Sequence, residues 1–283
     1  MAEGKLYIVA TPLGNLEDVT FRAVRILSEV DGIACEDSRR TVKLLNRYEI
    51  KTPLITYQEY NKEQAGEKII ARLKRGQRIA LVSDAGTPGI SDPGFNLIRD
   101  CIREGVEVEV IPGPSAIISA LVLSGLPTDR FAFEGFLPSK RERRREKLRE
   151  LSSEERTLVF YESPHRIRET LEDMREILPG RPLALVREMT KIHEEVLRGT
   201  VEEVCEEISS RESLHGEITL VVGGRKEREV TAGNLDEIVE REIAGFDGSP
   251  SDLARKISEL TGIPRKKIYS RILEVKKRLS PED

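Results

Sequence analysis

Short apolar, β-branched runs alternate with amphipathic helical patterns along most of the chain, and no other feature constrains the fold so strongly. In the first part of the chain the apolar runs occupy residues 6–10, 32–35, 54–57, 79–82 and 106–111. The intervening segments 20–30 and 63–75 place their apolar residues on one helical face, so each can cover a sheet. The alternation therefore predicts an α/β fold.

A second series of the same kind begins after Pro114. Its expected elements are an apolar helix at 115–123, strands at 130–136, 157–161, 182–186 and 218–222, and helices near 164–177 and 201–209. Because the two series share no detectable residue repeat, they predict two different α/β domains, residues 1–114 and 115–228, with a cleft between them.

The strand pattern stops at Val230, and residues 229–283 predict a small helical extension. Its last two helical patterns are joined by residues 261–264, where Gly262 suits a helix end and Pro264 a helix start. This arrangement is typical of a helix-turn-helix-like unit, whose second helix would carry Arg265, Lys266, Lys267 and Arg271. A small bundle that merely caps a sheet edge is the alternative.

Charge is unevenly distributed along the chain. The net charge of −4 excludes a polycation that binds nucleic acid indiscriminately. Two basic islands, residues 139–147 and 255–278, are nevertheless places where a phosphate backbone could bind. Each island could equally be a solvated helix face.

The cysteines and the start of the sequence bear on the compartment. Cys35, Cys101 and Cys205 are odd in number, widely spaced and without a Cys-x-x-Cys pair, which argues against a disulfide framework and a zinc site. The first residues lack an uninterrupted apolar stretch, and no run approaches the roughly 18 apolar residues of a membrane span. We expect a cytoplasmic protein.

Several familiar site motifs are missing from the sequence. It contains no Gly-x-Gly-x-x-Gly after the first strand and no Gly-Lys-Ser/Thr phosphate loop, so a cofactor without phosphate is favoured. His165, His193 and His215 lack metal-ligand spacing, and no Gly-x-Ser-x-Gly motif occurs. The sequence thus gives no support for a metal site or a hydrolytic triad.

Three Gly/Pro-dense loops, at residues 11–14, 83–94 and 112–115, follow expected strands. Ligands of open α/β sheets bind at the carboxyl ends of strands, which is where these loops would lie. Glycine lets the backbone approach a ligand closely, and proline stiffens the loop. Each loop alone resembles an ordinary turn, but three at one sheet edge predict a binding pocket.

These loops belong to a wider set of motifs, at residues 8–18, 36–41, 83–94, 111–116, 161–166, 187–195 and 216–222. Together they resemble the signature blocks of the small-subunit (16S) ribosomal RNA (cytidine 2′-O) ribose methyltransferase family, a branch of the tetrapyrrole-methylase superfamily. The resemblance covers about residues 5–224, and the helical tail is similar to the C-terminal extension of that family.

The resemblance implies two α/β/α domains of the tetrapyrrole-methylase type, a homodimer and S-adenosylmethionine as methyl donor. The acceptor it implies is a cytidine ribose in small-subunit ribosomal RNA, either free or in the assembled subunit. The cofactor-binding residues it implies are Leu13, Asp84, Gly86, Ile90, Ser115, Ala116, Tyr161, Met189, Glu217 and Ile218. The Gly-Asp-Pro of the superfamily is replaced here by Ser83-Asp84-Ala85, which leaves the contacts beyond Asp84 open.

Methyl transfer from a sulfonium is an in-line displacement that needs no metal, so the main task of the protein is to align the reacting atoms. A ribose hydroxyl is a weak nucleophile, and a general base would help. Candidate catalytic residues are Asp37, Glu162 and Lys191, although each could instead be an ion-paired structural residue, and Lys191 requires a lowered pKa. Candidate RNA contacts are Arg39, Arg40, His165 and Arg166.

Two other functions fit parts of the sequence. A tetrapyrrole C-methyltransferase would share the fold, but its pocket would have no need of basic islands. A DNA-binding regulator would use the C-terminal helix pair, but it would leave the loops of residues 1–224 unexplained.

Overall fold

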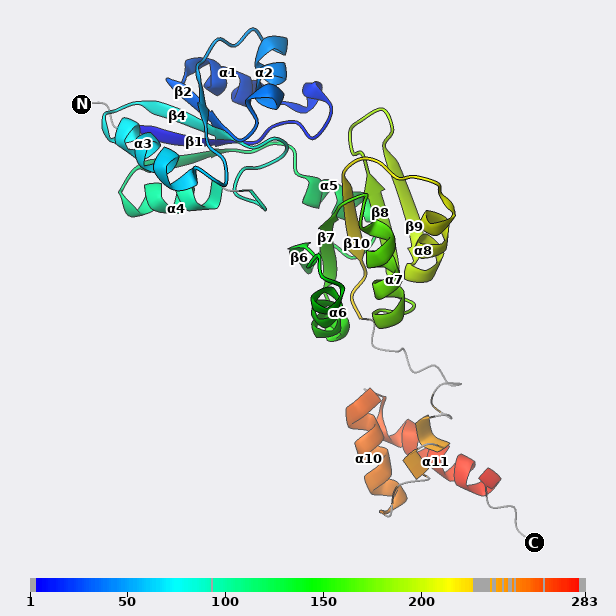
Figure 1. The fold of residues 1–283 in the computed structure, drawn as a ribbon. Coiled ribbons are helices and arrows are strands. Elements are labelled where there is room, and N and C mark those ends of the chain that lie inside the picture. The colour runs from blue at the N-terminus through cyan, green and yellow to red at the C-terminus, as the bar shows by residue number, and fades with distance from the viewer. Residues whose placement is uncertain are drawn as a thin grey trace. The chain divides into compact units, whose positions relative to one another are not determined.

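The computed structural model describes residues 4–92 and 94–225 and, towards the C-terminus, 235, 238–240, 242–243, 246, 248–261 and 263–279. The chain divides into two compact units, Met1–Arg225 and Lys226–Asp283 (Figure 1). The predicted division at residues 228 and 229 lies among residues outside the described ranges. Each unit is considered by itself.

The first half of the first unit is a parallel five-stranded sheet in the order β3-β2-β4-β1-β5. The strands are β1 (Lys5–Val9), β2 (Gly32–Cys35), β3 (Leu54–Thr56), β4 (Arg78–Val82) and β5 (Glu107–Ile111). The helices are η1 (Leu16–Asp18), α1 (Phe21–Glu29), α2 (Ser38–Arg47), α3 (Lys62–Lys74) and α4 (Gly94–Arg103). Because all strands run the same way, their carboxyl ends lie at one edge.

Helices cover both faces of this sheet. Tyr7 and Val9 of β1 pack in one cluster with residues of α1 and α2, whereas Leu6 and Ile8 pack in another with residues of α3 and α4. Alternate residues of a strand point to opposite faces, so a strand buried on both sides has the continuous apolar sequence seen here.

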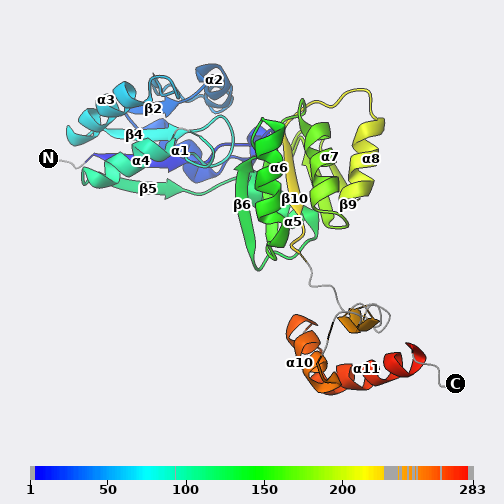
Figure 2. The same cartoon turned by 60° about the horizontal axis from the view of Figure 1, so that its bottom comes forward.

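The second half is a mixed sheet in the order β6-β7-β10-β8-β9 (Figure 1), in which only the β6–β7 pair is parallel. Figure 2 shows β6 at one edge of this sheet. Its strands are β6 (Phe131–Phe136), β7 (Thr157–Glu162), β8 (Pro182–Arg187), β9 (Glu195–Thr200) and β10 (Ile218–Val222). Its helices are α5 (Ala116–Ser124), α6 (Arg141–Glu150), η2 (Leu151–Ser153), α7 (Ile167–Ile177) and α8 (Val201–Ser210).

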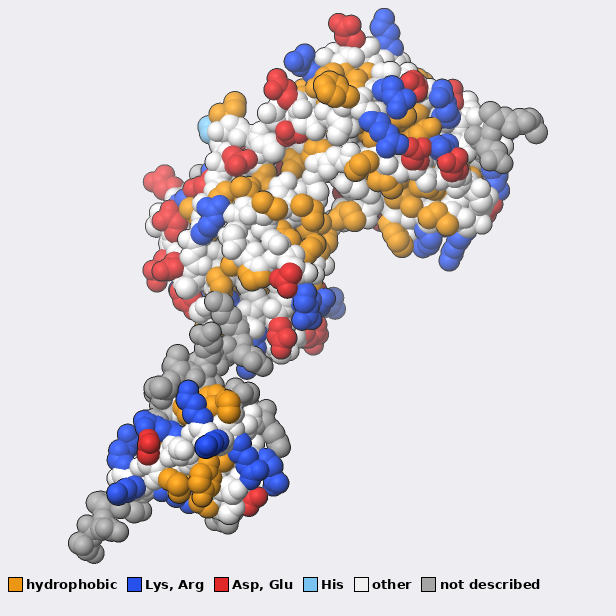
Figure 3. Space-filling model, turned by 180° about the vertical axis from the view of Figure 1, so that it is seen from behind, with side chains coloured by type: hydrophobic (Ala, Val, Ile, Leu, Met, Phe, Trp, Pro, Cys, Tyr) orange, Lys and Arg blue, Asp and Glu red, His pale blue; other side chains and the backbone are white. Residues whose placement is uncertain are grey.

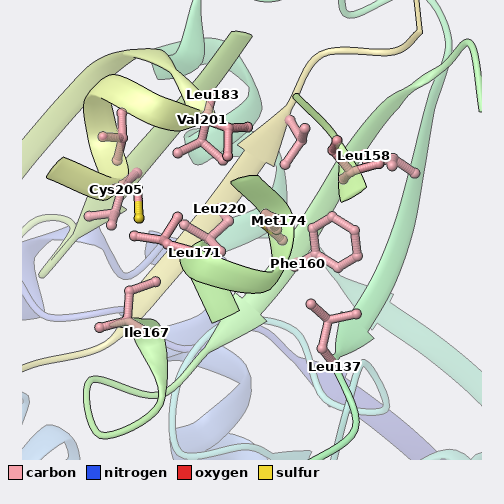
Figure 4. Close-up of a cluster of buried hydrophobic side chains, with 14 of the residues drawn as sticks. Leu137, Leu158, Phe160, Ile167, Leu171, Met174, Leu183, Val201, Cys205 and Leu220 are labelled. Atoms are coloured by element: carbon pink, nitrogen blue, oxygen red, sulfur yellow. The ribbon is translucent and has the colours of Figure 1, made fainter. Parts of the chain in front are cut away.

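Helix α5 packs on one face of this second sheet, and α6, α7 and α8 pack on the other. Phe160, Leu171 and Leu220 lie in the larger of the two clusters, between the sheet and α7 (Figure 4). The predicted α/β fold class with two sandwich-like halves is thus confirmed.

The predicted strands agree with the structure to within about one residue at each end, but four of the longer elements were not predicted, nor were the short helices η1 and η2. The four are α2, α4, α6 and β9. Strand β9 is an edge strand whose residues are only partly buried, so its apolar alternation is weak. The other three begin in or beside loops that the sequence marks by motif or charge rather than by periodicity.

The described part of the second unit contains the two expected C-terminal helices, α10 (Pro250–Thr261) and α11 (Arg265–Leu279). They pack through Leu253, Ile257, Ile268, Ile272 and Val275. The helix pair around residues 262–264 agrees with the predicted helix-turn-helix-like arrangement.

The basic island at 139–147 proves to be partly an internal ion-pair network, which neither sequence interpretation anticipated. Arg144 and Asp173 are both fully buried, and Arg144 Nε lies 2.8 Å from Asp173 Oδ2. Arg141 and Arg145 also bond to Asp173, at 3.2 and 3.0 Å. Much of the positive charge of α6 therefore holds α7 in place and is not available to a phosphate backbone.

Asp173→Asn should destabilise the protein by about 3–5 kcal/mol, because a buried guanidinium then loses its carboxylate. Burial acts to raise the pKa of Asp173, but hydrogen bonds from Arg144, Arg141 and Arg145 outweigh it and lower the pKa. The stabilisation is therefore present above the usual carboxyl pKa of about 4 and is lost as the pH falls through the lower folded pKa. Urea denaturation at several pH values measures both effects.

Glu150→Gln is the matched control, since Glu150 is exposed and lies 3.9 Å from Lys147 on the same helix. Its effect should stay within about 0.5 kcal/mol. Equal midpoints for the two variants would contradict a structural role for the Arg144–Asp173 pair.

Candidate active site

A cavity of about 670 Å³ lies between the two halves of the first unit. Its first wall comes from the loops after β1, β4 and β5, through residues such as Leu13, Gly86 and Ser115. Its second wall comes from the second sheet and its loops, including Tyr161, Met189 and Ile218. The volume suits a ligand of drug or cofactor size.

Backbone pairing fixes the first wall. Thr11 and Gly86 form an isolated bridge, in which Thr11 N donates to Gly86 O at 2.9 Å and Gly86 N donates to Thr11 O at 3.0 Å. The buried hydroxyl of Thr11 donates to Ser83 O at 3.1 Å. Gly86 has a φ of +74°, a conformation that glycine adopts without strain. The loops after β1 and β4 are thereby held side by side.

Aromatic side chains shape the second wall. The rings of Phe133 and Tyr161 meet edge to face at 5.0 Å, and Phe136 lies 5.6 Å from Tyr161. A bulge in β6 shifts the register between Phe133 and Gly135, and Gly135 has a φ of +67°. Burial, with the nearby charges of Asp92 and Glu217, raises the pKa of Tyr161 to about 12, so its hydroxyl stays protonated.

Contacts between the two halves close the sides of the site. Asn15 N donates to Thr190 Oγ1 at 3.1 Å, and Lys191 lies so close to Gly14 that a Cβ there would overlap its side chain. Arg40 on α2 lies 3.6 Å from Asp84 and 3.7 Å from Glu217 of the second half. Residues after β8 thus brace the loop after β1.

The lining of the cavity suits a cationic ligand without phosphate. Asp92, Glu162 and Glu217 line it, and among the described residues that line it there is no Lys, Arg or His. A sulfonium with an amino-acid tail carries positive charge, whereas a phosphate would need cationic partners. The apolar and aromatic part of the lining can hold an adenine ring.

Nine of the ten cofactor residues predicted from the sequence line this cavity. The exception is Asp84, whose carboxylate accepts a hydrogen bond from Asp37 N at 3.1 Å and faces Arg40. Asp84 therefore fixes the neighbouring loop instead of lining the cavity, and it lies between Ser83 and Ala85, the two positions where the sequence departs from the superfamily pattern.

The three predicted catalytic residues are all held by ion pairs. Hydrogen bonds from Arg39 lower the pKa of Asp37 to about 2, which makes it a poor base, and it does not line the cavity. Glu162 is buried and bonds to Arg166, to Thr170 at 2.6 Å and to Ser163 N at 2.7 Å.

Lys191 fails the condition on which its candidacy depended. Partial burial acts to lower its pKa, but Glu188 at 2.7 Å and Glu217 at 3.1 Å outweigh it, so the pKa is raised. Lys191 is therefore charged, and the geometry favours the structural alternative for it.

The residues predicted to contact RNA differ in how far their side chains are exposed and free to meet a ligand. The side chain of Arg39 is 87% exposed although it pairs with Asp37, and Arg40 and His165 are also exposed. Arg166 instead donates to Glu162 and, at 2.8 Å, to Leu137 O, which makes it part of the framework behind the cavity.

Asp92 is the residue that sequence reasoning missed. It lines the cavity, and burial together with the charges of Glu36 and Asp84 raises its pKa to about 6. Asp92 lies within the Gly/Pro loop 83–94, which the sequence did predict as part of the pocket. An aspartate before a proline is, however, typical of an ordinary turn, so Asp92 itself was not chosen. Phe133 and Phe136 were placed on a strand but not in the site.

Comparisons with known proteins agree with this geometry. The family model of Tetrapyrrole (Corrin/Porphyrin) Methylases matches residues 5–205. The Ribosomal RNA small subunit methyltransferase I of Halalkalibacterium halodurans is 47% identical over 275 residues, which cover 95% of this chain and 94% of that protein. The protein of the same name from Thermotoga maritima is 51% identical over 223 residues, which cover 79% of this chain and 100% of that protein.

The chain belongs to the tetrapyrrole methylases and, within them, to the ribosomal RNA small subunit methyltransferase I family. It is an enzyme whose methyl donor is S-adenosylmethionine. A crystal structure of uroporphyrin-III C-methyltransferase from Thermus thermophilus has the same fold, with a TM-score of 0.54 and 26% identity over 78% of this chain and 94% of that chain. The predicted family, fold class and cofactor are confirmed.

Ala116→Phe should weaken binding of S-adenosylmethionine to the enzyme roughly tenfold or more, because overfilling a packed site costs about 1–3 kcal/mol. Ala116 lines the cavity at the first position of α5, where a helix accepts either residue. Isothermal titration calorimetry measures the affinity, and Ala116→Ser, which keeps the side chain small, is the control. Wild-type affinity in Ala116→Phe would place the cofactor elsewhere.

Proposed function

We propose that the enzyme transfers a methyl group from S-adenosylmethionine to the 2′-oxygen of a cytidine ribose in small-subunit ribosomal RNA. The observation that carries the proposal is that no described residue lining the cavity is cationic, while the exposed Arg40 at the start of α2 lies 3.7 Å from the lining residue Glu217 and directly follows the exposed Arg39. The names of the relatives, at 47% and 51% identity, support the RNA substrate.

When bound, S-adenosylmethionine supplies an activated methyl carbon on a sulfonium. The residues of the chain then have to hold the acceptor oxygen in line with that carbon, and positioning of this kind supplies much of the rate acceleration. We propose that the nine predicted residues lining the cavity hold the cofactor, while Asp84 acts on them through the loop after β4.

Asp92 is the group we propose as proton acceptor for the ribose hydroxyl. It lines the cavity, and the described residues give it no ion pair, whereas Asp37, Glu162 and Lys191 all have ionic partners. A carboxyl whose pKa is about 6 is ionised at neutral pH and is a stronger base than an ordinary carboxylate.

Asp92→Asn should lower kcat roughly 100-fold or more while the affinity for S-adenosylmethionine is kept. The wild-type rate should rise with pH through about 6, as Asp92 loses its proton, and the variant should lack this rise. Single-turnover methylation between pH 5 and 8 measures both. Asp100→Asn, which changes a carboxyl on α4 that pairs with Arg99, is the control. An unchanged pH profile in Asp92→Asn would rule out this role.

Arg39→Ala should weaken RNA binding and spare cofactor binding, because its exposed guanidinium lies outside the cavity. Loss of one phosphate contact should reduce the slope of log affinity against log salt by about 0.7–1. Filter binding over a salt series tests this. Arg47→Ala, at the far end of the same helix, is the control and should keep the wild-type slope.

Transfer of a labelled methyl group tests the function as a whole. The full chain is incubated with methyl-labelled S-adenosylmethionine and with small ribosomal subunits, naked ribosomal RNA or a uroporphyrinogen. Label on a cytidine ribose supports the proposal, and label on the tetrapyrrole supports the alternative of C-methylation. Absence of label from all three, with binding to duplex DNA, supports a regulator.

We also propose that the enzyme is a cytoplasmic homodimer. Large apolar side chains are exposed on α4, β5 and α5, among them Ile102, Val110 and Val122, and Figure 3 shows hydrophobic side chains at the surface of both halves. Apolar surface of this kind typically packs against another protein surface. Sedimentation of the full chain measures the oligomeric state.

The proposed compartment rests on two observations. Cys35, Cys101 and Cys205 are free and buried, as expected in a reducing environment. In the part of the chain that the structure describes, no helix combines the length and apolar character that crossing a bilayer requires.

A further inference from the structure

Helix α11 has a far higher density of positive charge than the chain as a whole. Its 15 residues include seven Lys or Arg and a single acidic residue, Glu274, although the whole protein has a net charge of −4. In Figure 3 the C-terminal unit presents mainly blue side chains around hydrophobic ones. The positive charge of α11 is thus a property of this helix and not of the whole protein.

Part of this charge is used within the unit. Arg271 pairs with Glu274, Arg278 pairs with Glu240, and Arg265 donates to the Ser251 hydroxyl at 2.6 Å. Ile268, Ile272 and Val275 form the buried face of α11. At 100° per residue, Arg271, Glu274 and Arg278 share a second face, beside the buried one.

A third face remains, which we call the α11 stripe: Lys266, Tyr269, Leu273, Lys276 and Lys277. These positions follow the i, i+3, i+4 spacing that brings side chains to one side of a helix. Tyr269 is 40% exposed and Leu273 46% exposed, although both are large and carry apolar surface. The three lysines are exposed, and none has an ion pair with any residue in the described ranges.

The composition of the α11 stripe fits a strand of nucleic acid with unpaired bases. Lysine ammonium groups neutralise phosphates as point charges, and an exposed aromatic ring stacks on a base that is not paired. Lys266 and Lys277 are separated by about 16 Å along the helix axis, given a rise of 1.5 Å per residue. The lysines at its two ends can therefore contact separate phosphates on either side of Tyr269.

We propose that the α11 stripe binds an unpaired segment of the ribosomal RNA substrate, with Tyr269 stacked on a base and the three lysines on phosphates. This inference rests on the proposed function and extends it, since it assigns an RNA-binding surface remote in sequence from the cavity loops. Charge complementarity to the phosphate backbone is the argument for this occupant.

Lys276→Gln/Lys277→Gln in the full chain tests the phosphate contacts. Its slope of log affinity against log salt for the ribosomal RNA substrate should be shallower by about 1.4, at about 0.7 per contact to single-stranded RNA. The control, Lys51→Gln/Lys68→Gln, removes the same charge from two exposed lysines of the first unit. It should keep a slope close to that of the wild type.

Tyr269→Ala tests the stacking contact and should weaken RNA binding about tenfold, whereas Tyr269→Phe should retain it, because the ring suffices for stacking. Tyr60→Ala, which removes an exposed aromatic ring from the first unit, should leave affinity unchanged. Thermal unfolding of each variant should match the wild type, since none of the altered side chains is buried.

The outcomes separate this inference from the function on which it rests. If the wild type methylates ribosomal RNA and the stripe variants bind it as the controls do, the inference is wrong and the function stands. If the stripe variants lose affinity for duplex DNA but not for RNA, the surface serves a different nucleic acid and the inference is also wrong. If the wild type neither binds nor methylates ribosomal RNA, the proposed function itself fails.

Discussion

The site depends on the pairing of Thr11 with Gly86. A parallel sheet brings the carboxyl ends of its strands to one edge, but it does not determine where the loops beyond that edge go. The reciprocal backbone bonds of 2.9 and 3.0 Å form an isolated antiparallel bridge that joins the loop after β1 to the loop after β4. Leu13 and the residues after Gly86 are thereby held as one wall of the cavity.

Carboxylates line the cavity, while the cations that pair with two of them, Arg40, Lys191 and Arg166, do not line it. Arg40 lies between Asp84 and Glu217, so its charge is partly balanced by the two halves that it connects. The carboxylates of the cavity give a negative potential that suits a cationic cofactor, and the exposed arginines at the start of α2 give a positive potential that suits a polyanionic substrate.

The strands, the two halves and nine of the ten cofactor residues could be predicted because each depends on local pattern or on motifs within one loop. The environment of Asp92 could not, because its proton affinity depends on burial, on Asp84 eight residues earlier in the same loop and on Glu36 from the loop after β2. The buried position of Arg144 could not be predicted from the sequence either. Arginine is rarely fully buried, and its partner Asp173 lies 29 residues further along the chain.

The strand order of the second sheet has a consequence for how the chain matures during synthesis. Strand β10 is the last strand in sequence, yet it lies in the middle of the sheet, between β7 and β8. Until residues 218–222 have been synthesised, β7 and β8 lack the strand that joins them, and Ile218 and Thr219 are missing from the wall of the cavity. A nascent chain therefore lacks part of this wall until nearly all of the first unit has been synthesised.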